Sequence, residues 1–342
     1  MSEYQFVGAF ETPIELFDNV NGQYIEQKLR VGSFIHLDEI RERGGKSNIS
    51  AKKFSDEKGI IAFNHRLRIY GVWFDNYKDR HELTESQKRK LKEEMEAARR
   101  QAEAEERAKH EKAAYYATLF YQAAVPCTSH PYLNRKHVKS VGTLRQIDYS
   151  KAYDILKAYY LEVRGFTPVG FQSRAGGFLY KDFPLLLVPM RGNVSRIQAV
   201  QFIDCNGHKS FLYGCKKSGA YWQSEKLPEF DPDTTMTIGI GEGVATVLSV
   251  KQIKDFPVVS AMDCGNLKPV ALEIRSRFPK AKILILSDVG NGEKEALEAA
   301  QAANGQLAIP KFTDALRADF KRLTGKDNPT DFNDYYLAKG EI

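Results

Sequence analysis

The last third of the chain alternates between short apolar runs and helix-like segments, and this pattern restricts the fold more than any other feature. Apolar runs fall at 235–240, 258–262, 283–287 and 307–309, and helical patterns fall at 244–253, 269–278 and 293–303, the last with Gly305 as its expected C-cap. Strands that alternate with helices indicate a parallel sheet covered by helices. Residues 229–342 are therefore expected to form one α/β domain.

A carboxylate stands just beyond each of the first three predicted strands, at Glu242, Asp263 and Asp288. Ligands of open α/β sheets bind outside the carboxyl ends of the strands, so we expect these acids at one edge. Clustered carboxylates repel one another unless a cation neutralises them, and Mg²⁺ prefers hard oxygen ligands. Two alternatives stay open, namely Asp288 as a helix N-cap and Glu242 as a solvated loop residue. Glycines that would let a phosphate or a backbone approach this edge are Gly241, Gly243 and Gly290.

Three further regions precede the α/β domain. Residues 1–83 read as a small α+β or β-rich unit, because aromatic and β-branched runs such as 66–74 alternate with turn residues. Residues 84–125 are rich in helix-forming charged residues and predict a charged helical linker, with Thr84 and Gln87 forming a capping box. Residues 126–228 predict a β-rich subdomain with strands at 185–188, 197–203 and 211–213, joined by hairpin turns.

The β-rich region also carries the basic side chains expected to contact nucleic acid or nucleotide phosphates. Aromatic residues are interleaved with them, and bases stack on exposed aromatic rings. The alternative is that most of these rings belong to the core and many of the charges are merely solvated. Lys209, Lys216 and Lys217 are favoured because they flank a predicted strand. The full set is Arg135, Lys136, Arg191, Arg196, Lys209, Lys216 and Lys217.

Composition and charge exclude several classes of protein. Hydrophobic residues make up 42% and charged residues 27% of the chain, and the net charge of +6 is compatible with a polyanionic partner. No apolar run approaches the roughly 20 residues that span a bilayer, and the N-terminus lacks the layout of a secretory signal, so we expect a cytoplasmic protein outside the membrane. The four cysteines form no CxxC pair, so no zinc site is expected, and His130 and His208 are expected in polar turns or at the surface.

Several segments resemble the Toprim-containing DNA primases of plasmids and phages. Three segments resemble the Toprim domain itself: IGIGEGVATVLSV, SAMDCGNLKPVALEIRSRFP and ILILSDVGNGEKEALEAAQAANGQLAIPKF. The segment NPTDFNDYY resembles the final acidic motif of that domain. The segment that precedes Toprim in these primases is similar to HPYLNRKHV and LLLVPMRGNVSRIQAVQFIDCNGHKSFLYGCKKSGAYW. The stretch at 71–73 and the charged helix after it also fit the family layout. The resemblance covers most of the chain and is strongest over 130–335.

The resemblance implies a Rossmann-like Toprim sheet and a nucleotidyltransferase of phage or plasmid replication. Such an enzyme makes short RNA primers from NTPs on single-stranded DNA, with Mg²⁺ or alternatively Mn²⁺. Glu242 would be the catalytic, metal-linked acid/base, and Asp288 would hold the metal. Asp331 and Asp334 would complete the acidic edge. A fused helicase, frequent in such primases, has no counterpart in this sequence, so a separate replicative helicase is the expected partner.

One position departs from the family motif. The third-strand motif normally reads Asp-x-Asp, whereas this chain has Asp288, Val289 and Gly290. Glu293 lies a few residues further on and is the candidate substitute ligand, while Asp263 and Asn266 would line the crevice. Because the second carboxylate is missing, two alternatives to a primase remain. One is a Toprim nuclease, and the other is a degenerate Toprim domain that only binds nucleic acid or a protein partner.

Overall fold

The computed structural model describes residues 4–32, 34–40, 48–54, 57–75, 85–173, 175–192, 196–290 and 292–339. The chain divides into two compact units, Met1–Ala104 and Glu105–Ile342. The predicted charged helix is present as α2 (Glu85–Ala123), which contributes its first part to unit 1 and its last part to unit 2. Thr84 and the side chain of Gln87, and with them the expected capping box, lie outside the described residues.

The described residues of unit 1 form a five-stranded sheet, a short helix and the first part of α2, in agreement with the expected α+β unit. The strands β1 (Gln5–Phe10), β2 (Ile35–Leu37), β3 (Ile49–Lys53), β4 (Gly59–Asn64) and β5 (Ile69–Phe74) follow the order β1-β5-β4-β3-β2. Strands β1 and β5 pair in parallel, and the other neighbours pair antiparallel. Helix α1 (Pro13–Asn19) buries Leu16 and Phe17 against this sheet, and η1 (Glu26–Lys28) follows it. The strand predicted at 66–74 begins later, because Arg68 has a φ of 55° in the turn before β5.

The first sheet of unit 2 is antiparallel and contains the predicted hairpins. It has the order β10-β9-β8-β7-β6, formed by β6 (Val125–Pro126), β7 (Arg145–Ile147), β8 (Leu185–Arg191), β9 (Ile197–Ile203) and β10 (Lys209–Phe211). Strand β10 lies two residues earlier than predicted, so Lys209 is inside the strand rather than beside it. Helix α3 (Pro131–Arg135) precedes β7.

Helix α4 (Tyr149–Arg164) is a further element of this part and was not predicted from the sequence. Asp148 caps its start by accepting hydrogen bonds from the amides of Ser150 and Lys151, and Gly165 closes it in the left-handed conformation. The end of α2 packs beside α4, where Tyr116 donates a hydrogen bond to Glu162 (2.7 Å). Phe120 is fully buried, with its ring 4.8 Å from that of Phe202.

The second sheet of unit 2 has the expected parallel arrangement. Its order is β11-β13-β12-β14-β15, formed by β11 (Trp222–Gln223), β12 (Thr237–Gly241), β13 (Val258–Ser260), β14 (Lys282–Leu286) and β15 (Gln306–Ala308). Strands β12 to β15 are parallel, and β11 joins β13 as an antiparallel edge strand. The sheet thus includes residues that precede the domain start expected at 229.

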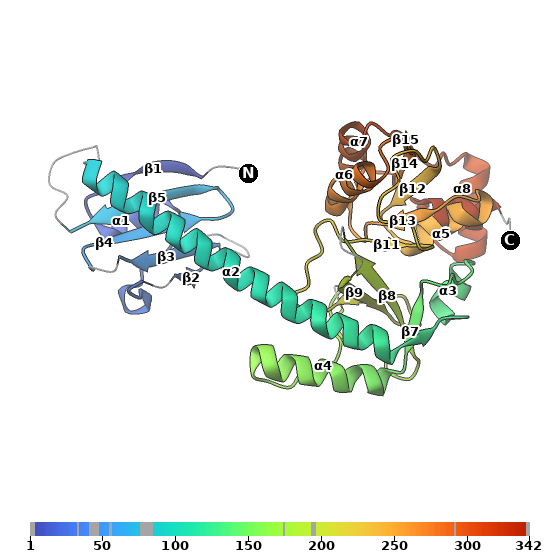
Figure 1. Cartoon of the computed structure of the whole chain (residues 1–342), viewed down its shortest axis with the longest axis horizontal. Coiled ribbons are helices and arrows are strands. Elements are labelled where there is room, and N and C mark those ends of the chain that lie inside the picture. Colours follow the sequence, from blue (N-terminus) through green and yellow to red (C-terminus); the bar gives the residue numbers. More distant parts are fainter. Residues whose placement is uncertain are drawn as a thin grey trace. The chain divides into compact units, whose positions relative to one another are not determined.

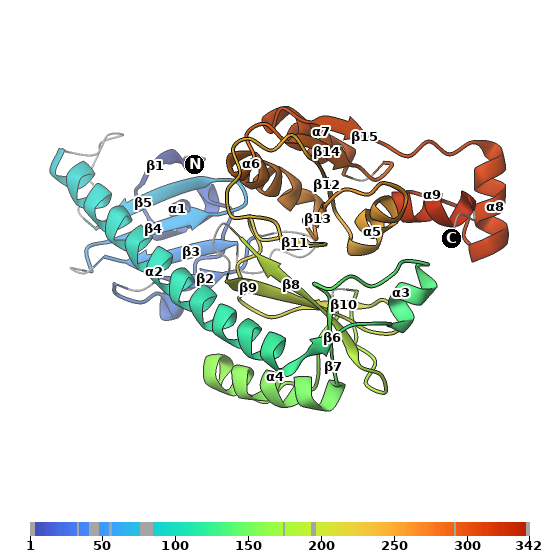
Figure 2. The ribbon, with the colours of Figure 1, turned by 45° about the vertical axis from the view of Figure 1, so that its right-hand side comes forward.

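Helices cover both faces of the parallel sheet. Figure 1 shows α6 (Leu267–Arg277) and α7 (Glu293–Ala302) on one face, and α5 (Val244–Ile253) on the other. Figure 2 shows α9 (Phe332–Lys339) beside α5, and α8 (Asp314–Thr324) next to α9. The C-cap of α7 is Ala303 and not the expected Gly305, whose amide instead donates to Ala300 O.

One hydrophobic core joins the two sheets of unit 2. Buried residues of β8 and β9, such as Leu187 and Val200, belong to the same cluster as Val247 and Leu248 of α5. Because protein interiors are closely packed, this shared core fixes the antiparallel sheet against one face of the parallel sheet. No helix in the described part of the chain is long and apolar enough to cross a membrane.

Candidate functional site

The loops after the three central strands of the parallel sheet meet at its carboxyl edge. Glu242 follows β12, Cys264 lies in η2 (Cys264–Asn266) after β13, and Gly292 lies in the loop after β14. A Cβ atom placed on Gly292 would lie 3.2 Å from Cys264 Cβ and 3.9 Å from Glu242 Oε2. The edge also requires a glycine at Gly241, since a Cβ there would lie 2.8 Å from Val247 Cγ1.

Asp331 is held at the same edge by contacts from two other elements. Thr246 Oγ1 of α5 donates to Asp331 Oδ2 (3.1 Å), and the amide of Asp334 donates to Asp331 Oδ1 (2.8 Å), which caps α9. The backbone of Val289, next to Asp288, donates to Thr330 O (2.7 Å). This last bond ties the loop after β14 to the segment that carries Asp331.

Four acidic residues therefore gather here, and we call Glu242, Asp288, Asp331 and Asp334 the acidic edge. Burial first, and then the charges of the other three, raise the pKa of Asp288 to about 7. Asp288 Oδ1 is buried and has no hydrogen-bond partner among the described residues. Burial and then Asp331 raise the pKa of Asp334 as well. The nearby positive charges and hydrogen-bond donors therefore do not balance the negative charge of Asp288 and Asp334.

Two of the expected basic residues act on the acidic edge. Lys209 in β10 lowers the pKa of Asp288, and Lys136 after α3 lowers that of Asp334, in both cases against the stronger raising effects. Asn333 of α9 holds the backbone of Lys136 in place, because its Nδ2 donates to Lys136 O (2.7 Å) and to Ser249 Oγ (2.9 Å).

The other expected basic residues lie elsewhere in unit 2. Arg135 donates to Cys205 O (2.8 Å), and Arg191 closes β8 at the end opposite Lys209. Lys216 and Lys217 are exposed after β10, with Lys217 Nζ 5.1 Å from the Phe211 ring centroid, and Arg196 is exposed before β9. The basic set is therefore spread over the antiparallel sheet and does not form one cluster.

Two further residues expected at the crevice, Asp263 and Asn266, have structural partners. Asp263 accepts from the amide of Gly265 (3.1 Å) and so caps η2. Asn266 is buried, accepts from the amide of Gly219 and donates to Ala220 O and Ala261 O. These bonds anchor the segment before β11 onto the parallel sheet.

The loop after β14 shows what stands in place of the missing second aspartate. Gly290 has a φ of 87°, and a Cβ placed on it would meet no atom within 4 Å. Its amide donates to Glu293 Oε1 (2.5 Å), so the Glu293 carboxylate closes the turn before α7. Asn291 lies outside the described residues.

The acidic edge suits a hard divalent cation with few protein ligands. Mg²⁺ binds in proteins through one or two carboxylates and keeps waters for substrate phosphates. The unpartnered Asp288 oxygen and its raised pKa match this demand, because a cation would stabilise the ionised form. In the described ranges, no three His, Cys, Asp or Glu side chains converge closely enough to form a fuller coordination shell.

Some residues of this region escaped the sequence analysis. Thr246 lies four residues after Glu242, a spacing that could have placed its hydroxyl near the edge. The prediction of a polar-turn or surface site for His130 is wrong, because that side chain is buried. Its Nδ1 accepts from the amide of Tyr132, and its Nε2 bonds Pro184 O (3.0 Å). His208 is half exposed and pairs with the buried Asp204.

Comparisons with known proteins agree with the resemblance seen in the sequence. Residues 237–341 match the Toprim domain family. Two curated proteins of Escherichia coli, both named DNA primase TraC, are 27% identical over 164 residues and 28% identical over 156 residues. These alignments cover 45% and 43% of this chain but only 15% and 11% of the two relatives.

Solved structures give weaker likenesses. The primase fragment of the bacteriophage T7 primase-helicase protein has a TM-score of 0.34 at 17% identity, over 48% of this chain and 62% of the fragment. The DnaG primase catalytic domain bound to single-stranded DNA has a TM-score of 0.35 at 13% identity, over 62% and 76%. At these values neither likeness assigns an activity.

The family match spans the whole parallel sheet from β12 to β15 and every member of the acidic edge. The parallel strands and the acids that follow them, both expected from the sequence pattern, belong to the same segment. Residues 237–341 of this chain are therefore a Toprim domain.

Proposed function

We propose that the chain is a DNA primase that makes short RNA primers on single-stranded DNA from NTPs in a Mg²⁺-dependent reaction. The observation that supports this most is the acidic edge of the Toprim domain, with Asp288 poorly compensated and Lys209 close enough to act on it. Relatives named as DNA primases support the same activity, although the chain aligns with a small part of them.

In this proposal Glu242 and Asp288 hold the cation, and Glu242 takes the proton of the attacking hydroxyl. When bound, Mg²⁺ supplies charge for the attacking and leaving oxygens of phosphoryl transfer. Asp331, oriented by Thr246, and Asp334 complete the negative edge. Lys209 faces the same edge and neutralises substrate phosphate. Lys136, Lys216 and Lys217 are proposed to contact nucleotide or template phosphates, and Mn²⁺ is the alternative ion.

The proposal is tested by primer synthesis on a single-stranded template, with wild type compared with Glu242→Gln. The substitution keeps the shape of the side chain and removes its charge, so product formation is expected to fall by at least about 10²-fold. Full activity of Glu242→Gln would contradict the assignment. DNA cleavage without NTPs would indicate the nuclease alternative.

A second candidate is a Toprim domain that binds nucleic acid or a protein without catalysis. Gly290 in place of an aspartate favours it, as does the lack of three converging ligand side chains in the described residues. Gly290→Asp separates the two functions. It has room for its side chain, and the left-handed backbone costs an aspartate about 1–2 kcal/mol. Activity that appears only in Gly290→Asp would identify a degenerate primase, whereas DNA binding in EDTA with no product from either protein would identify a binding module.

We also propose a cytoplasmic protein that works with a separate replicative helicase. This rests on the resemblance to plasmid and phage primases. Stimulation of primer synthesis by the helicase of the same replicon would support it, and equal activity with and without that helicase would contradict it.

A further inference from the structure

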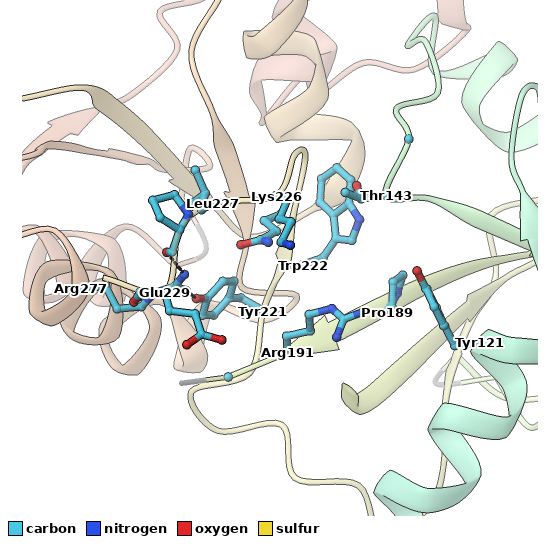
Figure 3. Close-up of a pocket in the computed structure, with 14 residues that line it drawn as sticks. Tyr121, Thr143, Pro189, Arg191, Tyr221, Trp222, Lys226, Leu227, Glu229 and Arg277 are labelled. Carbon is cyan, nitrogen blue, oxygen red and sulfur yellow. Dashed lines mark hydrogen bonds between the residues drawn. The ribbon is translucent and has the colours of Figure 1, made fainter. Parts of the chain in front are cut away.

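A cavity of about 800 Å³ lies in unit 2 where β8 ends beside β11 (Figure 3). Its wall includes Tyr121 from α2, Pro189 and Arg191 from β8, and Trp222 and Lys226 from the segment that contains β11. Small-molecule sites in proteins have volumes of about 300–1,000 Å³, so the cavity is large enough for one nucleotide.

This cavity is separate from the acidic edge. Lys209, which acts on Asp288, pairs with Ile203, and Ile203 pairs with Leu186 near the start of β8. Arg191 is the last residue of β8. With about 3.3 Å per strand residue, the two ends of β8 lie about 20 Å apart. No member of the acidic edge lines the cavity.

Arg191 lines the wall that contains Tyr121, and Arg145 contacts the same tyrosine without lining the cavity. The Arg145 and Arg191 guanidinium carbons lie 4.6 and 5.6 Å from the centroid of the Tyr121 ring, and Arg145 Nη2 donates to Tyr121 Oη (3.0 Å). The hydrogen bond from Arg145, with the charges of both arginines, holds the pKa of Tyr121 below its usual value despite burial. In the described ranges no carboxylate forms an ion pair with Arg145.

The opposite walls add a further cation, Lys226, and an apolar wall that contains Trp222. Lys226 is exposed, and Figure 3 shows it beside Trp222 and Thr143. The indole N–H of Trp222 is buried and has no hydrogen-bond acceptor among the described residues. Glu229 is the acidic residue of the wall, and Figure 3 shows it on the side of Arg277, away from Tyr121.

Backbone and side-chain bonds hold these walls in place. Arg191 and Tyr221 exchange two backbone hydrogen bonds of 2.8 Å each. Arg277 donates to Glu229 O (2.9 Å), to Pro228 O and to the Tyr221 hydroxyl, and so fixes the far wall. The cavity is therefore formed before any ligand arrives, which lowers the entropic cost of binding.

We propose that this cavity binds a nucleoside phosphate, either as a free nucleotide or as one nucleotide of a single strand. The guanidinium group of arginine binds two phosphate oxygens at once, and the planes of guanidinium groups and aromatic rings stack on bases. Arg191 and Lys226 bind the phosphate, and the base lies against Tyr121 and the apolar wall. The site does not depend on the proposed primase activity, because it uses no residue of the acidic edge.

The test measures fluorescence anisotropy of two probes with the full chain in EDTA, which removes metal-dependent binding at the acidic edge. The probes are fluorescently labelled ATP and a short labelled oligothymidylate. Lys226→Gln and the double variant Arg191→Gln, Lys226→Gln are compared with wild type. The matched control is Lys254→Gln, which removes one exposed charge of the same unit outside the cavity.

We expect the double variant to weaken binding of at least one probe by about tenfold or more, Lys226→Gln by less, and the control by none. If the variants bind ATP more weakly than wild type does, the cavity is a free-nucleotide site. If they bind only the oligothymidylate more weakly, it is a site for one nucleotide of a single strand. The proposal is overturned if neither probe binds, or if Lys226→Gln and the double variant bind both probes as wild type does. Because Lys226 is exposed, its replacement leaves the fold intact.

Discussion

Replacing Asp288 by asparagine is expected to stabilise the metal-free protein. Asp288 lies among Glu242, Asp331 and Asp334, and its buried Oδ1 has no partner in the described part of the chain. An ionised carboxylate there is repelled by three others and is poorly solvated. The Asp288→Asn substitution keeps the shape of the side chain and removes that charge, so it reports directly on the electrostatics of the acidic edge.

The size of the effect follows from the shifted pKa. The value rises from 3.8 in the unfolded chain to about 7 in the folded one, which is about three units, or about 4 kcal/mol at 1.36 kcal/mol per unit. Below pH 3.8 the group is neutral in both states, so wild type and Asp288→Asn should be equally stable. The cost to wild type grows as the pH rises from 3.8 and is complete above about pH 7.

Thermal unfolding between pH 4 and pH 8.5 in EDTA measures the difference. For a unit of this size each kcal/mol moves Tm by about 2–4 °C, so the variant should melt about 8–16 °C higher at pH 8. Mg²⁺ should raise the Tm of wild type more than that of the variant. The control Asp255→Asn removes an exposed charge of the same unit and should change little. A variant less stable than wild type at pH 8, or a difference independent of pH, would refute the reasoning.

One further substitution in each unit tests a buried contact, a ring contact in unit 2 and an ion pair in unit 1. Phe120→Ala should cost unit 2 about 3–5 kcal/mol, measured by denaturant unfolding, because its fully buried ring packs on Phe202; a cost below about 1 kcal/mol would contradict this packing. Glu39→Ala should cost unit 1 about 3–5 kcal/mol, because it leaves Arg66 and Asn64 without their buried acceptor. Burial alone would raise the pKa of Glu39, but hydrogen bonds from Asn64 and Arg66 outweigh it and lower the pKa. The Glu39 contribution is therefore present above about pH 4.5 and is lost as the pH falls, and an unchanged acid-unfolding profile in the variant would contradict it.

The order of strands and helices in the Toprim domain was predictable because each element has its own local signal. The continuous apolar run of β14 and the alternation in β12 locate buried parallel strands, and the regions between them have helical periodicity. Strand β11 had no such signal. It contains two residues and is defined by its pairing with Val259 and Ser260, a contact between distant parts of the chain.

Helix α4 was missed although its signals are local. Asp148, the apolar spacing of Ala152, Leu156 and Tyr159, and Gly165 together mark a capped amphipathic helix. The β-rich interpretation of 126–228 rested on the strand patterns at 185–188, 197–203 and 211–213, which lie outside this helix. The burial of His130 is a different case, because its bond to Pro184 O joins residues 54 positions apart and no local pattern indicates it.

The acids of the candidate site were also predictable only in part: their positions follow from local sequence, whereas their contacts do not. Their place at strand ends follows from the sequence pattern, but what each carboxylate does depends on which amide points at it. Asp263 and Glu293 accept hydrogen bonds from the amides of Gly265 and Gly290, so both contribute to turns. Asp288 has no such donor at Oδ1. A cation brought to this edge would therefore meet Asp288 as the carboxylate with an uncommitted oxygen. A first metal ion would be held mainly there, and a second would depend on Asp331, which already accepts from Thr246.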